Sequence, residues 1–364
     1  MNPVYLDHNA TTPMRASAID ALAAASRQTG NASSVHAWGR RARATVEDAR
    51  ESVAALVGAK PDWVVFTAGG TEANNLAMRG IVGRVAASAV EHPSVLKARD
   101  DIRPIPVDAD GVIQLEAVES ADLVSVMLAN NETGVIQPVA RVAEIAKIGG
   151  ALVHCDAVQA AGRRAIDMNA LGVDMVSLSA HKIGGPQGVG ALVARPNIRL
   201  EAVLRGGGQE RGVRAGTENV AAIAGFGAAA REARDGLTAM GAFSASRDKL
   251  ETEIHTVAPD AVVFGAGAER LSNTSCIAMP GVSAESQLMA FDLAGIMVSS
   301  GSACSSGKVA KSHVLAAMGV ADDLAETAIR VSLGWTSTEA DVERFIAAWS
   351  DLYARTRSVV RKVA

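Results

Sequence analysis

Short runs of consecutive apolar residues, many of them β-branched, alternate with longer segments of helical periodicity through the first two thirds of the chain. The apolar runs predict five strands, at 63–66, 85–88, 123–128, 151–154 and 175–178. Segments 40–56 and 139–148 carry apolar residues at helical spacing, which predicts helices. Because the strands are continuously apolar instead of alternating, we expect a mostly parallel sheet with helices on both faces.

The last third of the chain has a different pattern. It begins with a long segment rich in Ala, Arg and Glu, from 218 to about 257, which predicts helices with breaks near Gly236 and Gly241. Two strand-like and two helical segments follow, at 275–278, 296–298, 313–318 and 339–353. This mixture is typical of an α+β domain.

The length of the chain bears on how these elements divide. One hydrophobic core rarely grows past roughly 250–300 residues, and this chain has 364. We therefore expect a large α/β domain over 15–250, joined by the long helical stretch to a smaller domain made of 1–14 and 251–364. In a parallel sheet, ligands bind at the carboxyl ends of the strands, so functional residues are expected there.

Composition excludes several classes of protein. Aromatic residues are only 3% of the chain and the formal net charge is -4, which argues against nucleic-acid binding. No membrane-length apolar run and no apolar leader are present, so we expect neither membrane association nor export. Three scattered cysteines fit neither a disulfide framework nor a zinc site, and we expect no metal and a reducing, cytoplasmic location.

Lys182 is the first candidate for chemistry. It follows the strand at 175–178 and precedes the Gly-rich turn Ile183-Gly184-Gly185-Pro186. Burial at such a strand end lowers the pKa of a lysine and favours the neutral amine, which forms Schiff bases with aldehydes. A lone lysine at a strand end is more often a solvated surface residue, so this signal needs support from elsewhere.

A second candidate is the segment Thr67-Ala68-Gly69-Gly70-Thr71-Glu72, where a strand runs into two glycines and the start of a helix. Backbone amides at Gly70, the positive helix end and the Thr71 hydroxyl together suit a phosphate group. The alternative is an ordinary strand–turn–helix in which Thr71 is only the helix N-cap.

The strand at 151–154 ends in a third group of polar side chains. Asp156 could hold a pyridinium nitrogen through a charge-assisted hydrogen bond, and Gln159 could reach a ring hydroxyl. A capping role for the aspartate is the simpler alternative. A phosphate seat, a pyridinium partner and a Schiff-base lysine at three strand ends, however, together indicate pyridoxal 5'-phosphate (PLP).

The chain also carries sequence motifs in an order that resembles a known family. They include Tyr5-Leu6-Asp7-His8-Asn9-Ala10-Thr11-Thr12-Pro13, Glu91-His92-Pro93, Asn130-Asn131-Glu132-Thr133-Gly134, Gly216-Thr217-Glu218-Asn219 and Ser302-Ala303-Cys304. Nearly the whole chain resembles the cysteine desulfurases of the NifS/IscS type, which are PLP enzymes. The resemblance implies an aspartate-aminotransferase-like fold and the conversion of L-cysteine to L-alanine.

The resemblance implies a role for each residue of the reacting centre. Lys182 would bind PLP covalently, and His92 would stack on its ring and transfer protons. Asn131 and Arg330 would hold the substrate carboxylate, a task for which the guanidinium fork is suited. Without the family, His92 would pass for a loop residue and Arg330 for a strand residue facing solvent.

Further implied contacts hold the cofactor itself. Asp156 and Gln159 would bind the ring nitrogen and the phenolic oxygen. The phosphate contacts would come from four side chains and one backbone position, Gly70, Thr71, Ser179, His181 and, from a second subunit, Thr217. The last contact implies a homodimer with the site at its interface.

Cys304 is the candidate nucleophile. It lies in the small, polar, Gly-containing segment 299–308, whose composition predicts a mobile loop. Cys155 and Cys276 have strand-like neighbours and are expected to be buried. The resemblance implies that the Cys304 thiolate takes sulfur from the substrate as a persulfide and passes it to an acceptor protein, such as an iron–sulfur scaffold.

Three alternatives remain at the level of sequence. They are a class-V aminotransferase, a selenocysteine lyase, and a non-catalytic scaffold that has kept the fold. Alanine formation without a keto acid separates a desulfurase from an aminotransferase, and cofactor absorbance separates an enzyme from a scaffold. The identity of the sulfur acceptor and its pathway do not follow from these residues.

Overall fold

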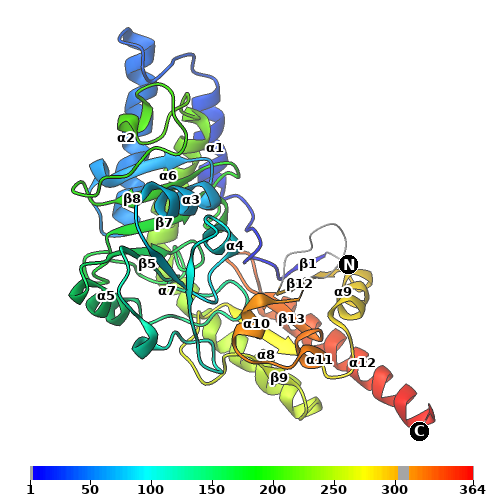
Figure 1. Ribbon diagram of the computed structural model, residues 1–364. Coiled ribbons are helices and arrows are strands. Elements are labelled where there is room, and N and C mark those ends of the chain that lie inside the picture. Colours follow the sequence, from blue (N-terminus) through cyan, green and yellow to red (C-terminus); the bar gives the residue numbers. More distant parts are fainter. Residues whose placement is uncertain (1–2, 302–310, 364) are drawn as a thin grey trace.

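A seven-stranded sheet forms the centre of the larger part of the protein, as the computed structural model shows for residues 3–301 and 311–363 (Figure 1). In spatial order the strands are β2 (Val64–Thr67), β8 (Gly190–Ala194), β7 (Met175–Ser179), β6 (Leu152–Asp156), β5 (Leu123–Ser125), β3 (Val85–Ser88) and β4 (Arg103–Ile105). The pairs from β7 to β4 are parallel, and β8 runs antiparallel to both of its neighbours. The predicted mostly parallel sheet is therefore correct.

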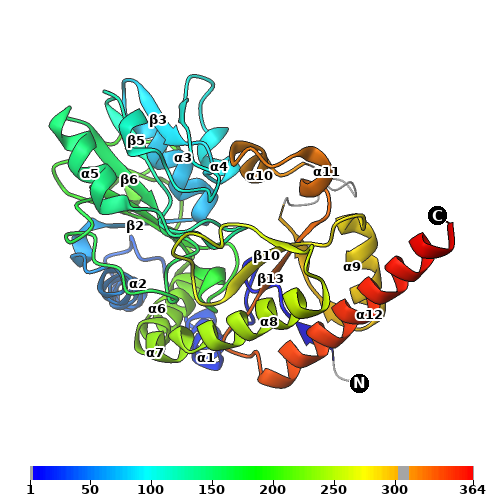
Figure 2. The ribbon, with the colours of Figure 1, turned by 90° about the horizontal axis from the view of Figure 1, so that it is seen from below.

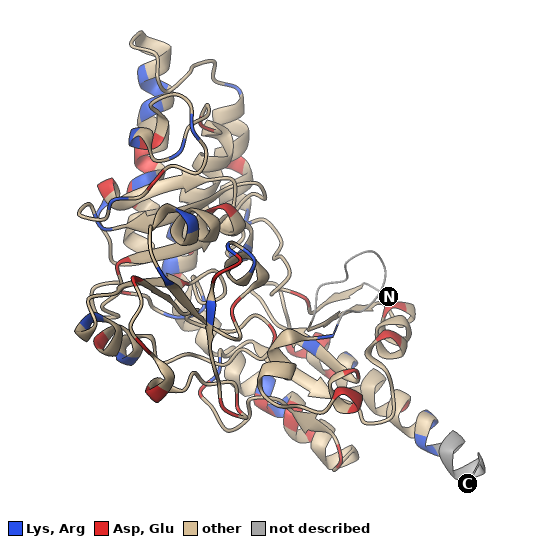
Figure 3. Cartoon of the chain, in the orientation of Figure 1, with Lys and Arg blue, Asp and Glu red and all other residues tan. Residues whose placement is uncertain are grey.

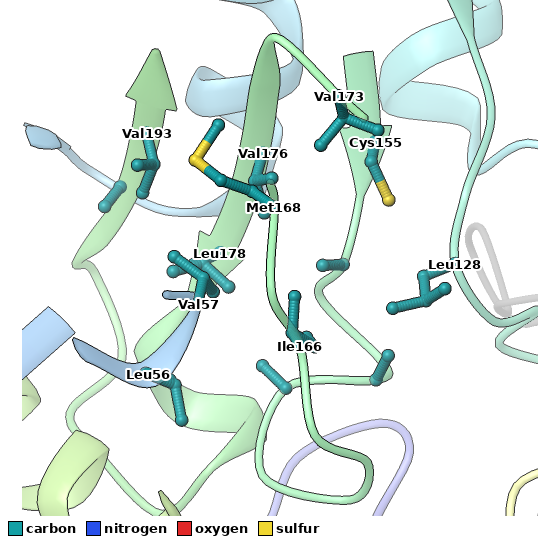
Figure 4. Close-up of a cluster of buried hydrophobic side chains, with 14 of the residues drawn as sticks. Leu56, Val57, Leu128, Cys155, Ile166, Met168, Val173, Val176, Leu178 and Val193 are labelled. Atoms are coloured by element: carbon teal, nitrogen blue, oxygen red, sulfur yellow. The ribbon is translucent and has the colours of Figure 1, made fainter. Parts of the chain in front are cut away.

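Helices cover both faces of this sheet, because alternate residues of each strand are apolar on opposite sides. Val64, Phe66 and Val176 belong to a buried cluster that includes residues of α1 (Ala16–Ser26), α2 (Ala37–Leu56), α5 (Val139–Ile148) and α6 (Val220–Asp235). Figure 4 shows part of this cluster, with Cys155 and Val176 on neighbouring strands. The intervening residues, such as Val65 and Met175, pack against α3 (Gly70–Gly80) and α4 (Pro93–Leu96). Burial on both sides explains why these strands are continuously apolar.

A second part of the protein is built on smaller sheets. Its antiparallel sheet has the order β12 (Ser299–Ser300), β13 (Ala328–Ser332), β10 (Thr274–Ala278) and β9 (Val262–Val263). Beside it, β1 (Val4–Tyr5) pairs in parallel with β11 (Ile296–Met297), so the beginning of the chain lies in this part. One buried cluster joins Leu6 to residues of α8 (Phe243–Val257), α9 (Ala284–Leu293) and α12 (Glu339–Val363).

Short helices and one long helix complete the second part. The short ones are α7 (Leu237–Gly241), α10 (His313–Ala317) and α11 (Asp322–Ala325). Figure 2 shows α8 and α12 lying side by side, and Lys249 of α8 pairs with Glu339 and Glu343 of α12 at 3.0 Å each. Charges of both signs occur on these two helices (Figure 3). Within the described residues, no helix combines the length and the apolar character needed to cross a bilayer.

The predicted elements differ from the structure at a few places. Strand 85–88 and helix 139–148 have the predicted bounds, and the breaks at Gly236 and Gly241 separate α6, α7 and α8. The C-terminal helix is longer than predicted, since α12 continues past residue 353 to Val363. Strand β5 is shorter than the predicted 123–128, because the chain leaves the regular ladder at Ser125. Strands β4 and β8 were not predicted.

Candidate functional site

A cavity of about 250 Å³ lies where the carboxyl ends of β6 and β7 meet the starts of α3 and α4. Its lining includes Gly70, Thr71, His92, Asn131, Asp156, Gln159, Ser179, His181 and Lys182, all of which the sequence singles out. Asn74, Ser94, Met127, Ala129 and Val158 line it as well. Because parallel strands end on the same side of a sheet, residues from distant parts of the chain meet here.

Lys182 closes a 3₁₀ turn, η3 (Ala180–Lys182), directly after β7. Its Nζ donates to the carbonyl oxygens of Asn9 and, at 2.9 Å, of Ala10. Burial, together with the positive charges of Arg163 and Arg330, lowers the pKa of Lys182 to about 7. About half of the amine is therefore neutral near neutral pH, which is the form that attacks an aldehyde.

The start of α3 forms a seat for an anion beside Ser179. The helix begins at Gly70 with Gly69 as its N-cap, so Thr71 lies in the first turn and is not the cap. Gly69 has a φ of 153°, which favours glycine. A Cβ at Gly70 would lie 2.9 Å from Val158 Cγ2 and 3.4 Å from Ser179 Cβ, so glycine allows the helix end to approach the strand end. The free amides of this first turn point toward bound negative charge.

His181 adds a second polar side chain to this seat. Its Nδ1 is 3.2 Å from Thr11 Oγ1. Burial lowers the pKa of His181 to about 4, with a smaller effect from the charge of Lys182. The imidazole is therefore neutral at neutral pH and serves the anion seat as a hydrogen-bonding group, not as a cation.

Asp156 is the last residue of β6 and is 5% exposed. Its Oδ1 accepts from the backbone amide of Val158 at 2.9 Å, and its Oδ2 accepts from Asn74 Nδ2 at 2.7 Å. These two donors fix the orientation of the carboxyl group. The sequence predicted Asp156 but not Asn74, which lies three residues after Thr71 and therefore on the same side of α3.

His92 also lines the cavity and is the N-cap of α4. Its Nδ1 accepts from the backbone amide of Ser94 at 3.1 Å and lies 2.7 Å from Ser94 Oγ. Burial lowers the pKa of His92, while the charge of Asp156 opposes this effect and those of Lys182 and His313 add to it. A neutral imidazole with one nitrogen held by Ser94 can exchange protons through the other nitrogen.

Gln159 is held by a residue that sequence reasoning missed. Arg163 lies one helical turn further on, and its Nη1 donates to both the carbonyl and the side-chain oxygen of Gln159. The amide nitrogen of Gln159 donates to the carbonyl of Asn9 at 3.0 Å. Burial lowers the pKa of Arg163 to about 9, helped by the charge of Arg330. The i, i+4 spacing from Gln159 was the available signal for Arg163.

Arg330, on β13 of the second part of the protein, contacts the cavity-lining residue Asn131. Its Nη1 donates to the carbonyl of Asn131 at 3.0 Å, and its Nη2 donates to Asp7 Oδ1 at 2.7 Å. In the described structure, Arg330 Nε and Asn131 Oδ1 are buried polar atoms without a hydrogen-bond partner. Such atoms are costly unless a ligand satisfies them. Arg330 Nε is a donor and suits a carboxylate substrate, whereas Asn131 Oδ1 is an acceptor and needs a donor.

Three predicted site residues are not among the residues that line this cavity: Arg330, which contacts the lining residue Asn131, and Thr217 and Cys304. Thr217 is exposed, in the segment between η4 (Gln209–Gly212) and α6. Cys304 lies outside the described residues. Cys155 and Cys276 are buried as expected, and burial raises the pKa of both thiols. Neither of these two provides a thiolate at neutral pH.

The residues present fit PLP on their own chemistry. The helix start with Ser179 and His181 suits its phosphate, Asp156 suits its ring nitrogen, and the partly neutral Lys182 suits its aldehyde. The unpaired Nε of Arg330 is a donor that suits the carboxylate of an amino acid.

Comparison with known proteins agrees with this assignment. The family model described as Aminotransferase class-V matches residues 4–345. An "IscS-like cysteine desulfurase" of Mycobacterium tuberculosis is 41% identical over 97% of each chain. A "Cysteine desulfurase" of Cereibacter sphaeroides is 42% identical over 99% of this chain and 98% of its own. The solved structure of a NifS-like protein from Rickettsia africae superposes with a TM-score of 0.90 and 36% identity, covering 97% of this chain and 100% of the other.

Proposed function

Because this chain belongs to the aminotransferase class-V family, and within it to the cysteine desulfurases, we propose that it converts L-cysteine to L-alanine with PLP. The sulfur is transferred to Cys304 as a persulfide and then to an acceptor protein, such as an iron–sulfur scaffold. The observation that carries the proposal is the convergence of Lys182, Asp156 and His92 on one cavity at the strand ends.

Each residue of the cavity has a task in this reaction. Lys182 holds PLP covalently, and Asp156 keeps a proton on the ring nitrogen. Bound PLP supplies an electron sink that makes the Cα proton acidic and the substrate sulfur electrophilic. Lys182, freed when the substrate amine takes its place, accepts the Cα proton. Arg330 and Asn131 hold the carboxylate, so that Cα lies in a defined position.

The sulfur transfer is a displacement at the substrate sulfur. The Cys304 thiolate attacks that sulfur, so an S–S bond forms while the bond between the substrate Cβ and sulfur breaks. The electron pair of the broken bond stays with the substrate carbon, which is protonated to give alanine. His92 holds and exchanges a proton at the nitrogen that Ser94 leaves free.

We also propose that the enzyme is a homodimer and that it is located in the cytoplasm. Thr217 is exposed and outside its own cavity, which supports a homodimer in which it reaches the phosphate of a second subunit. The buried clusters around the large sheet and around the smaller sheets support a division into 15–250 and 1–14 with 251–364. The described cysteines, Cys155 and Cys276, are free thiols, which suits a reducing cytoplasm.

The activity is tested by supplying the PLP-loaded protein with L-cysteine and a thiol reductant. We expect alanine and sulfide to appear in equal amounts without any keto acid. Alanine that forms only when a keto acid is added would identify an aminotransferase instead. Comparison of L-cysteine with L-selenocysteine at equal concentration separates a desulfurase from a selenocysteine lyase.

The pKa of Lys182 predicts how PLP uptake depends on pH. Only the neutral amine attacks the aldehyde, so the rate of covalent uptake by the PLP-free protein should rise with pH and level off above about 7. The rate is measured from the growth of the absorption band after mixing. Arg163→Met removes a positive charge that lowers the pKa of Lys182. In this variant the midpoint of the pH dependence of PLP uptake should therefore lie at higher pH. A rate that falls as pH rises from 6 to 8 would contradict the assignment.

A further inference from the structure

Four side chains form a continuous hydrogen-bonded chain across one wall of the cavity. Asn74 Nδ2 donates to Asp156 Oδ2 at 2.7 Å and to Ser94 Oγ at 2.8 Å. Ser94 Oγ is in turn 2.7 Å from His92 Nδ1. Asn74 is 1% exposed and Ser94 is 9% exposed, so water competes little for these bonds. The carboxylate that faces the ring nitrogen is thereby joined to the imidazole that exchanges protons.

In this row of hydrogen-bonded side chains, the neighbours of each group determine whether it donates or accepts. An amide oxygen facing the Asp156 carboxylate would be repelled, so the nitrogen of Asn74 faces it, and Asn74 Oδ1 has no partner among the described residues. The second hydrogen of that nitrogen goes to Ser94 Oγ. A hydroxyl that accepts on one side is free to donate its own hydrogen on the other, to His92 Nδ1.

His92 Nδ1 is therefore approached by two donors, the hydroxyl and the backbone amide of Ser94. A nitrogen with two donors aimed at it is unprotonated, so the proton of the neutral ring is on Nε2. Protonation of Nδ1 would bring hydrogens face to face. The same arrangement also opposes the doubly protonated cation.

We propose that Asn74 is a positioning residue that, through Ser94, holds His92 as the Nε2–H tautomer and ties it to the ionised Asp156. The catalytic role given to this tautomer rests on the proposed function. In the reaction, His92 then exchanges protons through Nε2 alone, while Asp156 retains the charge that the ring nitrogen needs. Both hydrogens of the Asn74 amide are used within the wall, so its nitrogen has none left to donate to a substrate.

The other charged and titratable groups near His92 do not bond to Nδ1 in the structure. Lys182 of η3 and His313 of α10 act on His92 through charge, and Asp156 of β6 does so with the opposite sign. His313 Nε2 lies 2.8 Å from the carbonyl oxygen of Glu91. The tautomer of His92 is thus determined locally by Ser94, and Ser94 is oriented by Asn74.

The tautomer of His92 can be measured in the absence of substrate by ¹⁵N NMR of full-length protein with labelled histidines. The spectra are recorded first on the PLP-free protein and then after PLP has been added back. The His92 signals are assigned by their loss in His92→Gln. We expect the wild type to show an unprotonated Nδ1 and a protonated Nε2. In Asn74→Ala the hydroxyl of Ser94 is free to turn, so Nδ1 gains proton occupancy. The pH at the midpoint of the His92 titration should rise by roughly one unit, because one unit corresponds to the net free energy of about one hydrogen bond.

Asn75→Ala is a matched control, because Asn75 is adjacent and bonds only to the carbonyls of Thr71 and Ser94. It should leave the His92 signals unchanged. Ser94→Ala should shift them in the same direction as Asn74→Ala, and the double variant should add little, since both act through one chain. Ser94→Thr retains the hydroxyl and should restore the wild-type pattern.

Two results would overturn the inference. One is a wild-type His92 that carries its proton on Nδ1. The other is folded Asn74→Ala and Ser94→Ala proteins whose His92 tautomer and midpoint equal those of the wild type. Alanine formation is measured separately, and the acid limb of its pH profile should move with the His92 midpoint. If the proposed function is wrong, the wild-type protein makes no alanine from L-cysteine, while the NMR result on His92 is unchanged.

Discussion

Replacement of Lys182 with alanine is expected to abolish covalent PLP binding and to lower alanine formation by about 10³-fold or more, since a nucleophile and a proton acceptor are lost together. The structure supports the prediction because burial and the charges of Arg163 and Arg330 make this amine partly neutral near neutral pH. The absorption band of covalently bound PLP, near the visible edge, should disappear from the purified variant.

Lys147→Ala is the control for this experiment, because Lys147 is an exposed lysine at the end of α5 and is not one of the residues that line the cavity. It should keep the band and the activity of the wild type. A small primary amine added to Lys182→Ala should restore part of the alanine formation, if the fold is intact. A persistent band with normal turnover in Lys182→Ala would show that another group binds the aldehyde.

Replacement of Cys304 with serine is expected to leave PLP binding intact and to reduce sulfide release by about 10³-fold or more, because a hydroxyl is a far weaker nucleophile than a thiolate. The other two cysteines are 0% exposed and burial raises their thiol pKa, so neither is able to replace it. Sulfide release from L-cysteine and the absorption of bound PLP are measured on the same sample.

Cys276→Ala is the matched control for the thiol. It removes a buried thiol from β10 and should retain sulfide release while lowering the stability of the protein slightly. Cysteine labelled with ³⁵S should leave a reductant-sensitive label on the wild type and on Cys276→Ala. Wild-type sulfide production by Cys304→Ser would remove Cys304 from the mechanism.

The parts of the fold that were predictable have strong local patterns. Strand β3 and helix α5 have their predicted bounds because their apolar residues follow one period without interruption. Strand β8 was missed because the short segment Gly190–Ala194 lacks a pattern of its own, and the backbone pairs on both sides identify it as a strand. Helix α12 was cut short because segment 354–363 has more polar than apolar residues in the sequence.

The residues of the candidate site also divide into those that the local sequence predicts and those that it does not. Lys182, Asp156 and Thr71 were identifiable because each lies at the end of a strand or within four residues after it, where adjacency along the chain already predicts a position at the sheet edge. Asn74 and Arg163 were not, because their roles depend on partners that fold next to them. Nothing near Asn74 in the sequence indicates that it bonds to Asp156, 82 positions away.

The amino-acid sequence by itself therefore determined the class of fold, the type of cofactor and the side chains that meet it, since these depend on residue type and local order. Tertiary structure alone decided that the segment around Asn9 contacts Lys182 and that Arg330 reaches Asn131 from the other part of the protein. It also decided the lowered pKa of Lys182 and the contacts of Ser94 with His92 Nδ1. These properties arise from desolvation and from long-range hydrogen bonds, which no local pattern along the chain specifies.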